Sequence, residues 1–588
     1  MSGQPKRILI VGGVAAGMSC AARLRRLDEH AAIIVVEMGP YVSYANCGLP
    51  YALGGVIADE SALHVQTVAK LQSWFNLDIR VNTALVRIQR SAKSATVRDL
   101  ATNVDSVLPY DKLVLAMGNE SVVPSSIEGA RLAHVHTLQT IPDLQAIEAI
   151  MAATTTTTTT TTPCHTAAVI GGGFIGLEAA ENLHRRGLAV TIFEYGTHVF
   201  PPIDADIAQV LHDELRRNGV RLELDARVTK ISARRQTTSD AKTEEEASLS
   251  SPPLVFAEGQ HEPVPADLVI LAVGARARTA IARDSGLAVG ETGVTVNDAM
   301  QTSDPDIYAV GDMVETPNIV AAGRHMQAAL AGPANRQGRL AADHICGHDV
   351  RYRGSLGTSV CKVFGLTVGI VGLSCHALDR LGIRHQYVTV HPPQHATYYG
   401  GATAMTIKLA FAQPGGRIVG AQLVGQEGVD KRIDVLATAM RAGMTVEDLE
   451  HLELGYAPPY GAAKDAVNMA GFVAGNVLRG DVQIVHASDL TANELLHKFQ
   501  VLDVRSAEEY ARGCVKGAVN TPLPELRERL SEVRKDVPVV VYCFVGYRGY
   551  VAARILEQNG YDVYNLDGGF KTVTDAGYRA LQEHPHGA

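Results

Sequence analysis

Two of the eight cysteines lie in glycine-containing loops where a thiol can act as a nucleophile. Cys47 lies in the segment 43–51, in a turn that leads into a predicted helix, and Cys543 lies in the segment 543–549, after an apolar run. The positive end of a helix lowers the pKa of a nearby thiol, so the sequence predicts a reactive thiolate at Cys47. A loop of backbone N–H groups would stabilise a thiolate or persulfide at Cys543. The alternative for Cys47 is a buried structural cysteine.

The remaining six cysteines are scattered without a CxxC pair or a spacing typical of metal ligands: Cys20, Cys164, Cys346, Cys361, Cys375 and Cys514. This pattern disfavours a disulfide framework and a structural zinc site. We expect most of them to be small buried side chains, and we expect no metal site.

A glycine turn at residues 171–176 predicts a nucleotide site. Gly171, Gly173 and Gly176 fit the pattern G-x-G-x-x-G between an apolar run and a predicted helix, which places bare backbone and a helix N-terminus against a pyrophosphate. The next apolar run ends in Glu194. Its carboxylate can accept hydrogen bonds from a ribose 2′-OH and repel a 2′-phosphate, which favours NADH over NADPH. A solvated strand end is the alternative for Glu194.

The first glycine turn repeats this design near the N-terminus. Gly12 and Gly17 follow the apolar run 8–11, and the run 33–36 ends in Glu37, but Val14 replaces the middle glycine. Two such strand–turn–helix openings imply two bound nucleotides.

Other elements must position these residues. Apolar runs ending at Gly118 and Gly274 predict further buried strands, and short strands and helices after about Cys361 predict an α+β domain. Beyond Arg479 a new α/β unit begins, with strands at 501–504 and 539–542. The threonine run 154–162 and the polar stretch 234–253 predict surface insertions, because neither can bury enough apolar surface to offset ordering entropy.

Composition excludes several classes of protein. At roughly 150 residues per domain, 588 residues predict about four domains, and 46% apolar and 20% charged residues suit a globular chain. The net charge of -9 argues against nucleic acid as a partner. No apolar run approaches the ~20 residues that span a bilayer, so we expect a cytoplasmic protein without a membrane partner.

The segment 306–312 allows a family to be named. It resembles the second FAD motif of the two-dinucleotide flavoprotein disulfide reductases, in which the final aspartate, here Asp312, holds the ribityl chain of the flavin. The resemblance covers about residues 7–475 and implies FAD and NADH as cofactors. The residues that it assigns to FAD are Gly12, Gly17, Glu37, Asn46 and Asp312, and those that it assigns to NADH are Gly171, Gly173, Gly176, Glu194 and Gly274.

The cysteine loop identifies the branch of this family. Residues 43–51 resemble the single-cysteine loop of coenzyme A-disulfide reductases and of their relatives, the persulfide reductases, NADH oxidases and NADH peroxidases. The second cysteine of glutathione-reductase-like members is Ala52 here, and neither His391-Pro392 nor His584-Pro585 has the context of their acid/base motif. The resemblance therefore implies that Cys47 acts alone as the catalytic nucleophile.

Further positions match the coenzyme A-disulfide reductases one at a time. The resemblance implies coenzyme A contacts at Ser19, Arg23, Arg26, Ser43 and Asn46, and Arg25 extends the basic cluster that suits phosphates. A solvated helix face is the alternative for these arginines. Tyr456 and Tyr398 match two active-site tyrosines, with Tyr456 in a segment supplied by the partner subunit of a homodimer. Lys464 matches a substrate contact, and Asn335 replaces the usual histidine at another.

The C-terminal unit resembles the rhodanese domains, in which a loop surrounds an anionic sulfur. Four residues separate Cys543 from Arg548, as in rhodaneses, which implies sulfane sulfur as the cargo and a catalytic role for both residues. The segment 503–505 and Gly568-Gly569 also fit, while Cys514 replaces the family's usual histidine. An inert interaction module is the alternative for this unit.

Together these observations predict an α/β chain with two Rossmann-like dinucleotide-binding domains, an α+β dimerisation domain and a C-terminal α/β rhodanese domain. The predicted boundaries are 1–163 and 276–345 for FAD, 164–275 for NADH, 346–478 for dimerisation and 479–588 for the rhodanese unit. The predicted function is NADH-dependent reduction of coenzyme A disulfide, coenzyme A persulfide or polysulfide. The alternatives are an NADH oxidase or peroxidase that cycles through a sulfenic acid, and a low-turnover sulfur-relay or redox-sensing protein.

Overall fold

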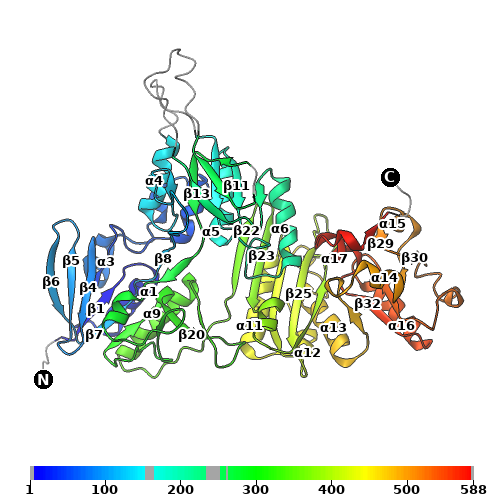
Figure 1. Ribbon diagram of the computed structural model, residues 1–588. Coiled ribbons are helices and arrows are strands. Elements are labelled where there is room, and N and C mark those ends of the chain that lie inside the picture. The colour runs from blue at the N-terminus through cyan, green and yellow to red at the C-terminus, as the bar shows by residue number, and fades with distance from the viewer. Residues whose placement is uncertain (1–4, 153–163, 234–251, 260–261, 585–588) are drawn as a thin grey trace, which may run out of the picture. The chain divides into compact units, whose positions relative to one another are not determined.

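The computed structural model describes residues 5–152, 164–233, 252–259 and 262–584, which form two compact units (Figure 1). Unit 1 comprises residues 1–196 and 219–355, and unit 2 comprises residues 197–218 and 356–588. The two stretches predicted as surface insertions lie outside the described residues, except for Pro252 and Pro253.

Unit 1 contains a parallel five-stranded sheet in the order β19-β7-β1-β2-β3. Parallel strands buried on both faces are rich in Val, Ile and Leu, and in β1 all residues after Arg7 are buried. Ile10 of β1 lies opposite Val35 of β2 and Val114 of β7. The strands are β1 (Arg7–Val11), β2 (Ala32–Val36), β3 (Asp78–Arg80), β7 (Lys112–Leu115) and β19 (Ile307–Ala309).

Two helices cover this sheet and pack closely together. Helix α1 (Ala15–Leu27) and helix α9 (Ala331–Ile345) meet where Gly338 approaches the backbone of Ala16, because a Cβ at Gly338 would lie 2.1 Å from the Ala16 carbonyl oxygen. The segment that follows β19 is therefore held beside the first glycine turn. An antiparallel meander, β4 (Thr83–Gln89), β5 (Ser94–Asp99) and β6 (Val104–Pro109), extends from the same region of the chain.

A second sheet of unit 1 repeats the design in the order β12-β11-β10-β16-β9. Val169 of β10 lies opposite Ile192 of β11 and Ile270 of β16, and helix α5 (Phe174–Arg185) follows the glycine turn. The strands are β9 (Val135–His136), β10 (Thr166–Ile170), β11 (Ala189–Phe193), β12 (Arg221–Glu223) and β16 (Leu268–Leu271). Both predicted strand–turn–helix openings are confirmed.

Unit 2 begins with an antiparallel sheet in the order β22-β23-β26-β25-β24, which confirms the predicted α+β domain. Helices α11 (Val429–Ala442) and α13 (Ala466–Arg479) pack against it. Helix α6 (Ala205–Arg217) also belongs to this unit, where Lys408 contacts Asp206 at 2.7 Å. The strands are β22 (Ser359–Val363), β23 (Leu366–Gly372), β24 (His385–Val390), β25 (Met405–Ala412) and β26 (Ile418–Gly425).

The C-terminal part of unit 2 is a parallel sheet in the order β27-β32-β31-β28-β30, flanked by short helices, with β27 at Ile484–Val485 and β30 at Ala518–Asn520. The elements used below are β28 (Gln500–Asp503), β31 (Val539–Tyr542), β32 (Val563–Leu566), α15 (Ala507–Ala511), α16 (Tyr547–Gln558) and α17 (Gly569–Asp575). Helix α16 begins directly after Gly546, because this residue adopts the left-handed φ of 97° and lets the chain turn into the helix.

None of the described helices is both long and apolar enough to cross a bilayer. Within the part of the chain that the structure describes, no three His, Cys, Asp or Glu side chains are grouped to hold a metal ion.

Candidate active sites

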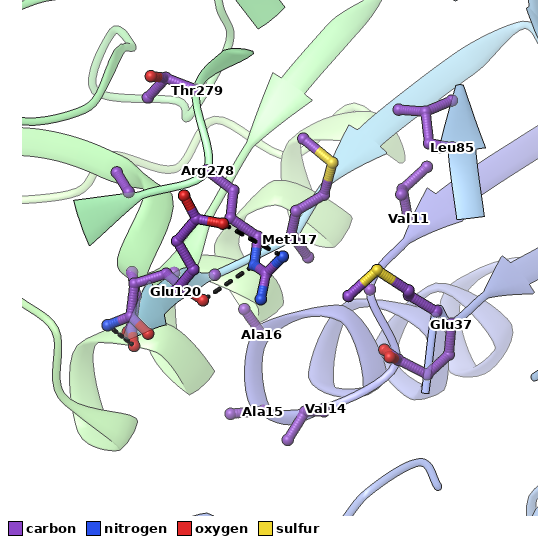
Figure 2. A pocket seen from close by; sticks show the side chains of 18 of the residues that line it. Val11, Val14, Ala15, Ala16, Glu37, Leu85, Met117, Glu120, Arg278 and Thr279 are labelled. Atoms are coloured by element: carbon purple, nitrogen blue, oxygen red, sulfur yellow. Dashed lines mark hydrogen bonds and ion pairs between the residues drawn. The ribbon is translucent and has the colours of Figure 1, made fainter. Parts of the chain in front are cut away.

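The first glycine turn opens into a cavity of about 910 Å³ in unit 1 (Figure 2). The lining includes the residues after β1, Glu37 at the end of β2, Met117 after β7 and Asp312 after β19. Figure 2 shows Val14 and Glu37 on the walls of this cavity. The volume lies at the upper end of the ~300–1,000 Å³ of typical ligand pockets, so the cavity fits an elongated dinucleotide.

The glycines of this turn are needed for close backbone approach. Gly12 has a φ of 108°, and a Cβ there would lie 2.1 Å from the Ala116 carbonyl oxygen, while a Cβ at Gly17 would lie 1.8 Å from that of Gly12. The middle position is different, because a Cβ at the equivalent Gly173 has nothing within 4 Å. Val14 can therefore replace the middle glycine, with its side chain at the cavity.

The Glu37 carboxylate is hydrogen-bonded to the backbone of the first glycine turn. Its carboxylate accepts hydrogen bonds from the backbone N–H groups of Gly13, at 2.7 Å, and Gly39, at 2.8 Å. The same side chain lines the cavity, as does Asn46 from the cysteine loop. Both residues line the cavity, and their contact with a bound nucleotide stays a prediction.

Asp312 lies in a single helical turn, Gly311–Met313, and also lines the cavity. The side-chain amide of Asn119 donates to its carboxylate at 3.2 Å, and burial raises the pKa of Asp312 to about 6. A buried carboxylate with one protein donor has lone pairs left for the hydroxyls of a ligand. The residues present therefore fit FAD, which the turn at Gly12 and Gly17, Glu37, Asn46 and Asp312 would hold.

Replacing Asp312 by asparagine should stabilise the FAD-free protein at neutral pH. Because the folded pKa of about 6 is raised above 3.8, the ionised carboxylate opposes folding above pH 6, and this cost fades as the pH falls toward 4. We expect apo Asp312→Asn to gain roughly 1–3 kcal/mol at pH 7.5 and little at pH 4, measured by denaturant unfolding. Equal gains at both pH values would show that the carboxylate charge is not the cause. The same variant should bind FAD more weakly.

The second glycine turn reproduces the first in detail. Gly171 has a φ of 104°, and the Glu194 carboxylate accepts from Gly172 N–H at 2.6 Å and Gly196 N–H at 2.7 Å. A Cβ at Gly176 would lie 1.9 Å from the Gly171 carbonyl oxygen. Gly274 follows β16 with a φ of 106°. The five predicted NADH residues thus lie around one turn, with bare backbone at Gly173 for a pyrophosphate.

Tyr195 is a candidate nucleotide contact that the sequence analysis missed. It follows Glu194 and is 73% exposed. The equivalent residue of the first turn is Met38, which follows Glu37 and lines the dinucleotide cavity. Aligning Glu37-Met38-Gly39 with Glu194-Tyr195-Gly196 would have revealed this position from the sequence.

Replacing Glu194 by arginine should move the cofactor preference toward NADPH. The carboxylate repels a 2′-phosphate, whereas a guanidinium attracts one. We expect the ratio of kcat/KM for NADH over NADPH to fall by about tenfold or more, since charge-assisted hydrogen bonds are worth ~1.5–3 kcal/mol. Glu194→Gln is the matched control, because it keeps acceptors for Gly172 and Gly196 without adding a positive charge. Equal use of both cofactors by the unaltered protein would remove Glu194 from this role.

Cys47 is exposed in a single turn of 3-10 helix, Asn46–Gly48, ahead of the short helix α2 (Leu49–Leu53). Asn46 Oδ1 lies 3.9 Å from the Cys47 sulfur. Ser43 adopts a φ of 48°, and its N–H donates to the Gly13 carbonyl at 2.8 Å, which fastens the cysteine loop to the first glycine turn. The loop thereby presents Cys47 beside a residue that lines the cavity.

The predicted lowering of the Cys47 pKa is wrong. Desolvation raises the pKa of this thiol, and the carboxylates of Glu178 and Asp312 raise it further, while only the local backbone lowers it. Burial is the main cause of this rise, and a helical turn of three residues contributes too little dipole to offset burial and the two carboxylates. Glu178 itself accepts a hydrogen bond from the Tyr51 hydroxyl at 2.9 Å.

The predicted coenzyme A residues on α1 differ in what they contact. Ser19 hydrogen-bonds Asn335, and Arg23 pairs with Asp343 at 2.6 Å. Arg26 is exposed. Arg25 does not belong to a basic surface cluster, because it is buried and donates to four backbone carbonyls, those of Asp28, Glu29, Phe75 and Asn76.

Unit 2 brings together the two predicted tyrosines. The hydroxyls of Tyr398 and Tyr456 lie 2.5 Å apart, and both side chains are exposed. The hydrogen bond with Tyr456 raises the pKa of Tyr398. Lys464 is also exposed on this unit. An exposed pair of hydrogen-bonded phenols is available to a ligand or to a second chain.

Cys543 follows β31 at the base of a tight loop and is buried. The N–H of Phe570 donates to the Cys543 carbonyl at 2.9 Å, and that of Lys571 donates to the Phe544 carbonyl at 2.8 Å. A Cβ at Gly569 would lie 2.5 Å from the Cys543 carbonyl oxygen. The first residues of α17 thus hold two carbonyl groups of the Cys543 loop in place.

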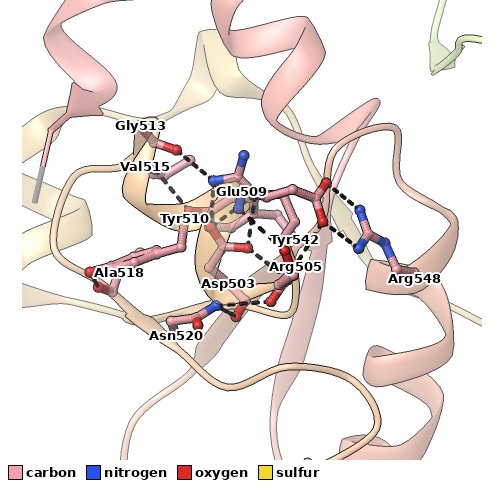
Figure 3. Close-up of polar contacts among 11 residues, drawn as sticks. Asp503, Arg505, Glu509, Tyr510, Gly513, Val515, Ala518, Asn520, Tyr542 and Arg548 are labelled. Atoms are coloured by element: carbon pink, nitrogen blue, oxygen red, sulfur yellow. Dashed lines mark hydrogen bonds and ion pairs between the residues drawn. The ribbon is translucent and has the colours of Figure 1, made fainter.

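Arg548 reaches across to Glu509 of α15 (Figure 3). Both of its terminal nitrogens donate to the Glu509 carboxylate, each at 2.7 Å. Glu509 is the main cause that raises the pKa of Arg548, and Cys543 contributes less. The guanidinium is therefore shared between a carboxylate and the sulfur.

Asp503, Arg505 and Tyr542 form a buried polar network next to the start of the Cys543 loop (Figure 3). Arg505 forms a two-pronged ion pair with Asp503, and Asp503 also accepts from the Tyr542 hydroxyl at 2.7 Å. Tyr542 immediately precedes Cys543. Cys514, which replaces the usual histidine of rhodaneses, is buried, and burial raises its pKa to about 11. It is therefore a neutral thiol.

A polar junction, missed by the sequence analysis, joins the two sheets of unit 2. The N–H of Thr389, in β24, donates to both carboxylate oxygens of Asp567, at 3.0 and 2.9 Å. His391 lies 2.8 Å from the Thr572 hydroxyl, and burial lowers the pKa of this histidine to about 3. We call Thr389, His391, Asp567 and Thr572 the sheet junction. It fixes the start of α17, which holds the Cys543 loop.

Three protein-family models match successive parts of this chain. The family model described as pyridine nucleotide-disulphide oxidoreductase matches residues 6–336, the model of its dimerisation domain matches residues 358–467, and that of the rhodanese-like domain matches residues 488–576. Coenzyme A disulfide reductase from Staphylococcus haemolyticus is 31% identical over 475 residues, which are 80% of this chain and 99% of the relative.

Two solved structures resemble nearly the full chain. Reduced CoADR-RHD from Bacillus anthracis is 42% identical with a TM-score of 0.91, and the match covers 98% of this chain and 99% of that one. A NAD-dependent persulfide reductase from A. fulgidus is 34% identical with a TM-score of 0.85, and the match covers 96% of this chain and 99% of that one.

Proposed function

Because this chain belongs to the pyridine nucleotide-disulphide oxidoreductases and carries a C-terminal rhodanese-like domain, we propose that it reduces coenzyme A disulfide or persulfide through Cys47 while Cys543 carries sulfane sulfur. The chain is an oxidoreductase that uses FAD and NADH. When bound, FAD supplies the two-electron relay between NADH and sulfur. The observation that carries the proposal is the exposed thiol of Cys47 beside Asn46, whose side chain lines the cavity.

Cys47 acts as the nucleophile in this proposal. Its thiolate attacks one sulfur of R–S–S–R, forms a mixed disulfide and releases RS⁻. With R–S–SH the thiolate attacks the carbon-bound sulfur, forms the same mixed disulfide and releases HS⁻. The overall reactions are NADH + H⁺ + RSSR giving NAD⁺ + 2 RSH, and NADH + H⁺ + RSSH giving NAD⁺ + RSH + H₂S. Glu178 and Asp312 raise the pKa of Cys47 and so disfavour its thiolate. A bound electron-poor group near the sulfur must therefore stabilise the thiolate form of Cys47.

Substrate binding follows from the charges on α1. Arg26 is exposed and Arg23 is only partly neutralised by Asp343, so both can contact the phosphates of coenzyme A. Ser19 lies on the same helix, and Ser43 and Asn46 lie in the cysteine loop; these residues provide hydroxyl and amide groups. We expect a homodimer in which Tyr398, Tyr456 and Lys464 of one chain complete the site of the other, because these polar side chains are exposed in the single chain.

An assay of three acceptors side by side tests the proposal. The purified protein should be yellow, with one FAD per chain released on denaturation. Coenzyme A disulfide, coenzyme A persulfide and polysulfide are each supplied with NADH, and its oxidation is followed at 340 nm under anaerobic conditions. At least one should support turnover well above the rate without acceptor. Turnover only with dioxygen would instead identify an NADH oxidase.

A further inference from the structure

Trp74 is the single tryptophan of the chain and lies on the surface of helix α3 (Val68–Phe75) in unit 1. It is 65% exposed, whereas Leu71 of the same helix is buried in the hydrophobic core. The Lys70 ammonium lies 4.3 Å from the centroid of the indole ring. One face of an exposed indole can therefore hold a cation while the other face receives a second flat ring.

The C-terminal ends of α3 and α1 are fastened to each other. Arg25 of α1 donates to the carbonyl groups of Phe75, at 2.8 Å, and Asn76, at 2.9 Å. The guanidinium carbon of Arg26 lies 6.0 Å from the centroid of the Phe75 ring. Trp74 therefore directly precedes the aromatic residue that Arg26 contacts.

The predicted coenzyme A residues on α1 lead to this point. Ser19, Arg23 and Arg26 form one stripe, because residues spaced by three or four positions share a face of a helix. The stripe starts beside the first glycine turn, where the Ser43 N–H of the cysteine loop donates to Gly13, and it extends ~10 Å along the helix. A ligand with its sulfur at the cysteine loop and its phosphates along this stripe would bring its far end to the exposed indole.

Stacking on the indole must contribute more than charge at this point. Two cations, Arg26 and Lys70, lie over aromatic rings of α3. Two carboxylates follow at the end of α1, where Asp28 accepts from two backbone N–H groups, at 2.9 and 3.1 Å, and Glu29 is exposed. The exposed Asp78 after α3 pairs with a neighbouring arginine at 2.7 Å. Because the carboxylates offset the cations, the aromatic face supplies most of the affinity for this end of a ligand.

We propose that Trp74 and Lys70 form a platform for the adenine ring of a coenzyme A disulfide or persulfide whose sulfur lies at Cys47. We call this pair the adenine platform. It rests on the proposed function and adds selectivity to it, because a pantetheine disulfide carries the same reactive sulfurs without a nucleotide. Purine bases stack on aromatic side chains, and the phosphates beside the adenine would lie toward Arg26. Trp74 thus sets substrate preference without contacting the reacting sulfurs.

Reduction of two disulfides by the FAD-containing protein tests the adenine platform. Coenzyme A disulfide and pantethine, the disulfide of pantetheine, are compared with NADH under anaerobic conditions. In Trp74→Ala the ratio of kcat/KM for coenzyme A disulfide over pantethine should fall about fivefold or more, mainly through a higher KM for coenzyme A disulfide, because a stacking partner of the base is lost. Trp74→Phe is the matched control and should keep most of the ratio, since it retains an aromatic face.

Fluorescence of the single tryptophan gives an independent readout. The FAD-containing protein is titrated with adenosine 3′,5′-bisphosphate, the nucleotide end of coenzyme A without its thiol arm. Saturating NAD⁺ is present to occupy the second glycine turn. Stacking of the adenine should quench the emission of Trp74 in a saturable manner. Lys70→Gln, which keeps the side-chain length and removes the charge, should weaken this binding about twofold or more.

The outcomes separate two failures. An unchanged ratio in Trp74→Ala, an equal fall in Trp74→Ala and Trp74→Phe, or inhibition by the bisphosphate without quenching would overturn the adenine platform and leave the proposed function in place. Turnover with neither disulfide in the unaltered protein would overturn the proposed function, and the adenine platform with it.

Discussion

Replacing Cys47 by serine is expected to abolish disulfide and persulfide reduction while the protein remains folded and yellow. Loss of a catalytic nucleophile costs on the order of 10⁴-fold or more in turnover. The side chain is exposed and lies in a three-residue helical turn, so the change from sulfur to oxygen removes little packing. The flavin absorbance should still bleach on addition of NADH, because only the later step needs the thiolate.

The matched control for this experiment is Cys346→Ser. Cys346 ends α9, is partly exposed and belongs to no predicted site. It should keep near-normal turnover with the same acceptors. Retained turnover in Cys47→Ser, with acceptor-dependent NADH oxidation confirmed by product analysis, would show that Cys47 is structural and that another group carries the electrons.

Replacing Cys543 by serine is expected to eliminate sulfane-sulfur transfer and to leave reduction of a free disulfide at Cys47 largely intact. The loop of Cys543 is held by α17 and the buried Asp503–Arg505 pair, none of which belongs to the nucleotide cavity of unit 1. Persulfide on residue 543 should fall below detection by mass spectrometry, whereas NADH oxidation with coenzyme A disulfide should change by less than about twofold.

If the two cysteines act in series, donors that load Cys543 should raise NADH consumption in the unaltered protein and not in Cys543→Ser. A small persulfide that enters the Cys47 site directly would bypass this dependence, so the donor concentration is varied. A folded, FAD-containing Cys543→Ser protein that loses all activity, including that on free disulfides, would require one composite site in place of two.

The sequence predicted those features that depend on neighbouring residues. The two glycine turns, Glu37, Glu194 and the loop before Arg548 each combine residue type and short spacing, and the structure places them as expected. The helix pattern could not separate Arg25 from Arg23 and Arg26, because burial of Arg25 depends on carbonyls of Phe75 and Asn76, which are distant in sequence.

The thiol pKa of Cys47 shows the same limit more clearly. The local turn indicated a lowered pKa, but burial of the thiol raises the pKa most, and Glu178 and Asp312, which only the folded chain brings near the sulfur, raise it further. The sheet junction was equally hidden, since Thr389 and Asp567 are separated by 178 residues. Long-range electrostatics and domain contacts therefore needed the structure.

The sheet junction has a consequence for how such a fusion can be taken apart. Because Asp567 and His391 are buried between the two sheets, cutting the chain between them would leave the Asp567 carboxylate with His486 but without the N–H of Thr389, and would leave that N–H without its acceptor. The C-terminal domain therefore cannot be exchanged without also changing its contact with β24. Grafting it onto another protein, or exchanging it for a foreign sulfurtransferase, would require transplanting the edge of β24 as well.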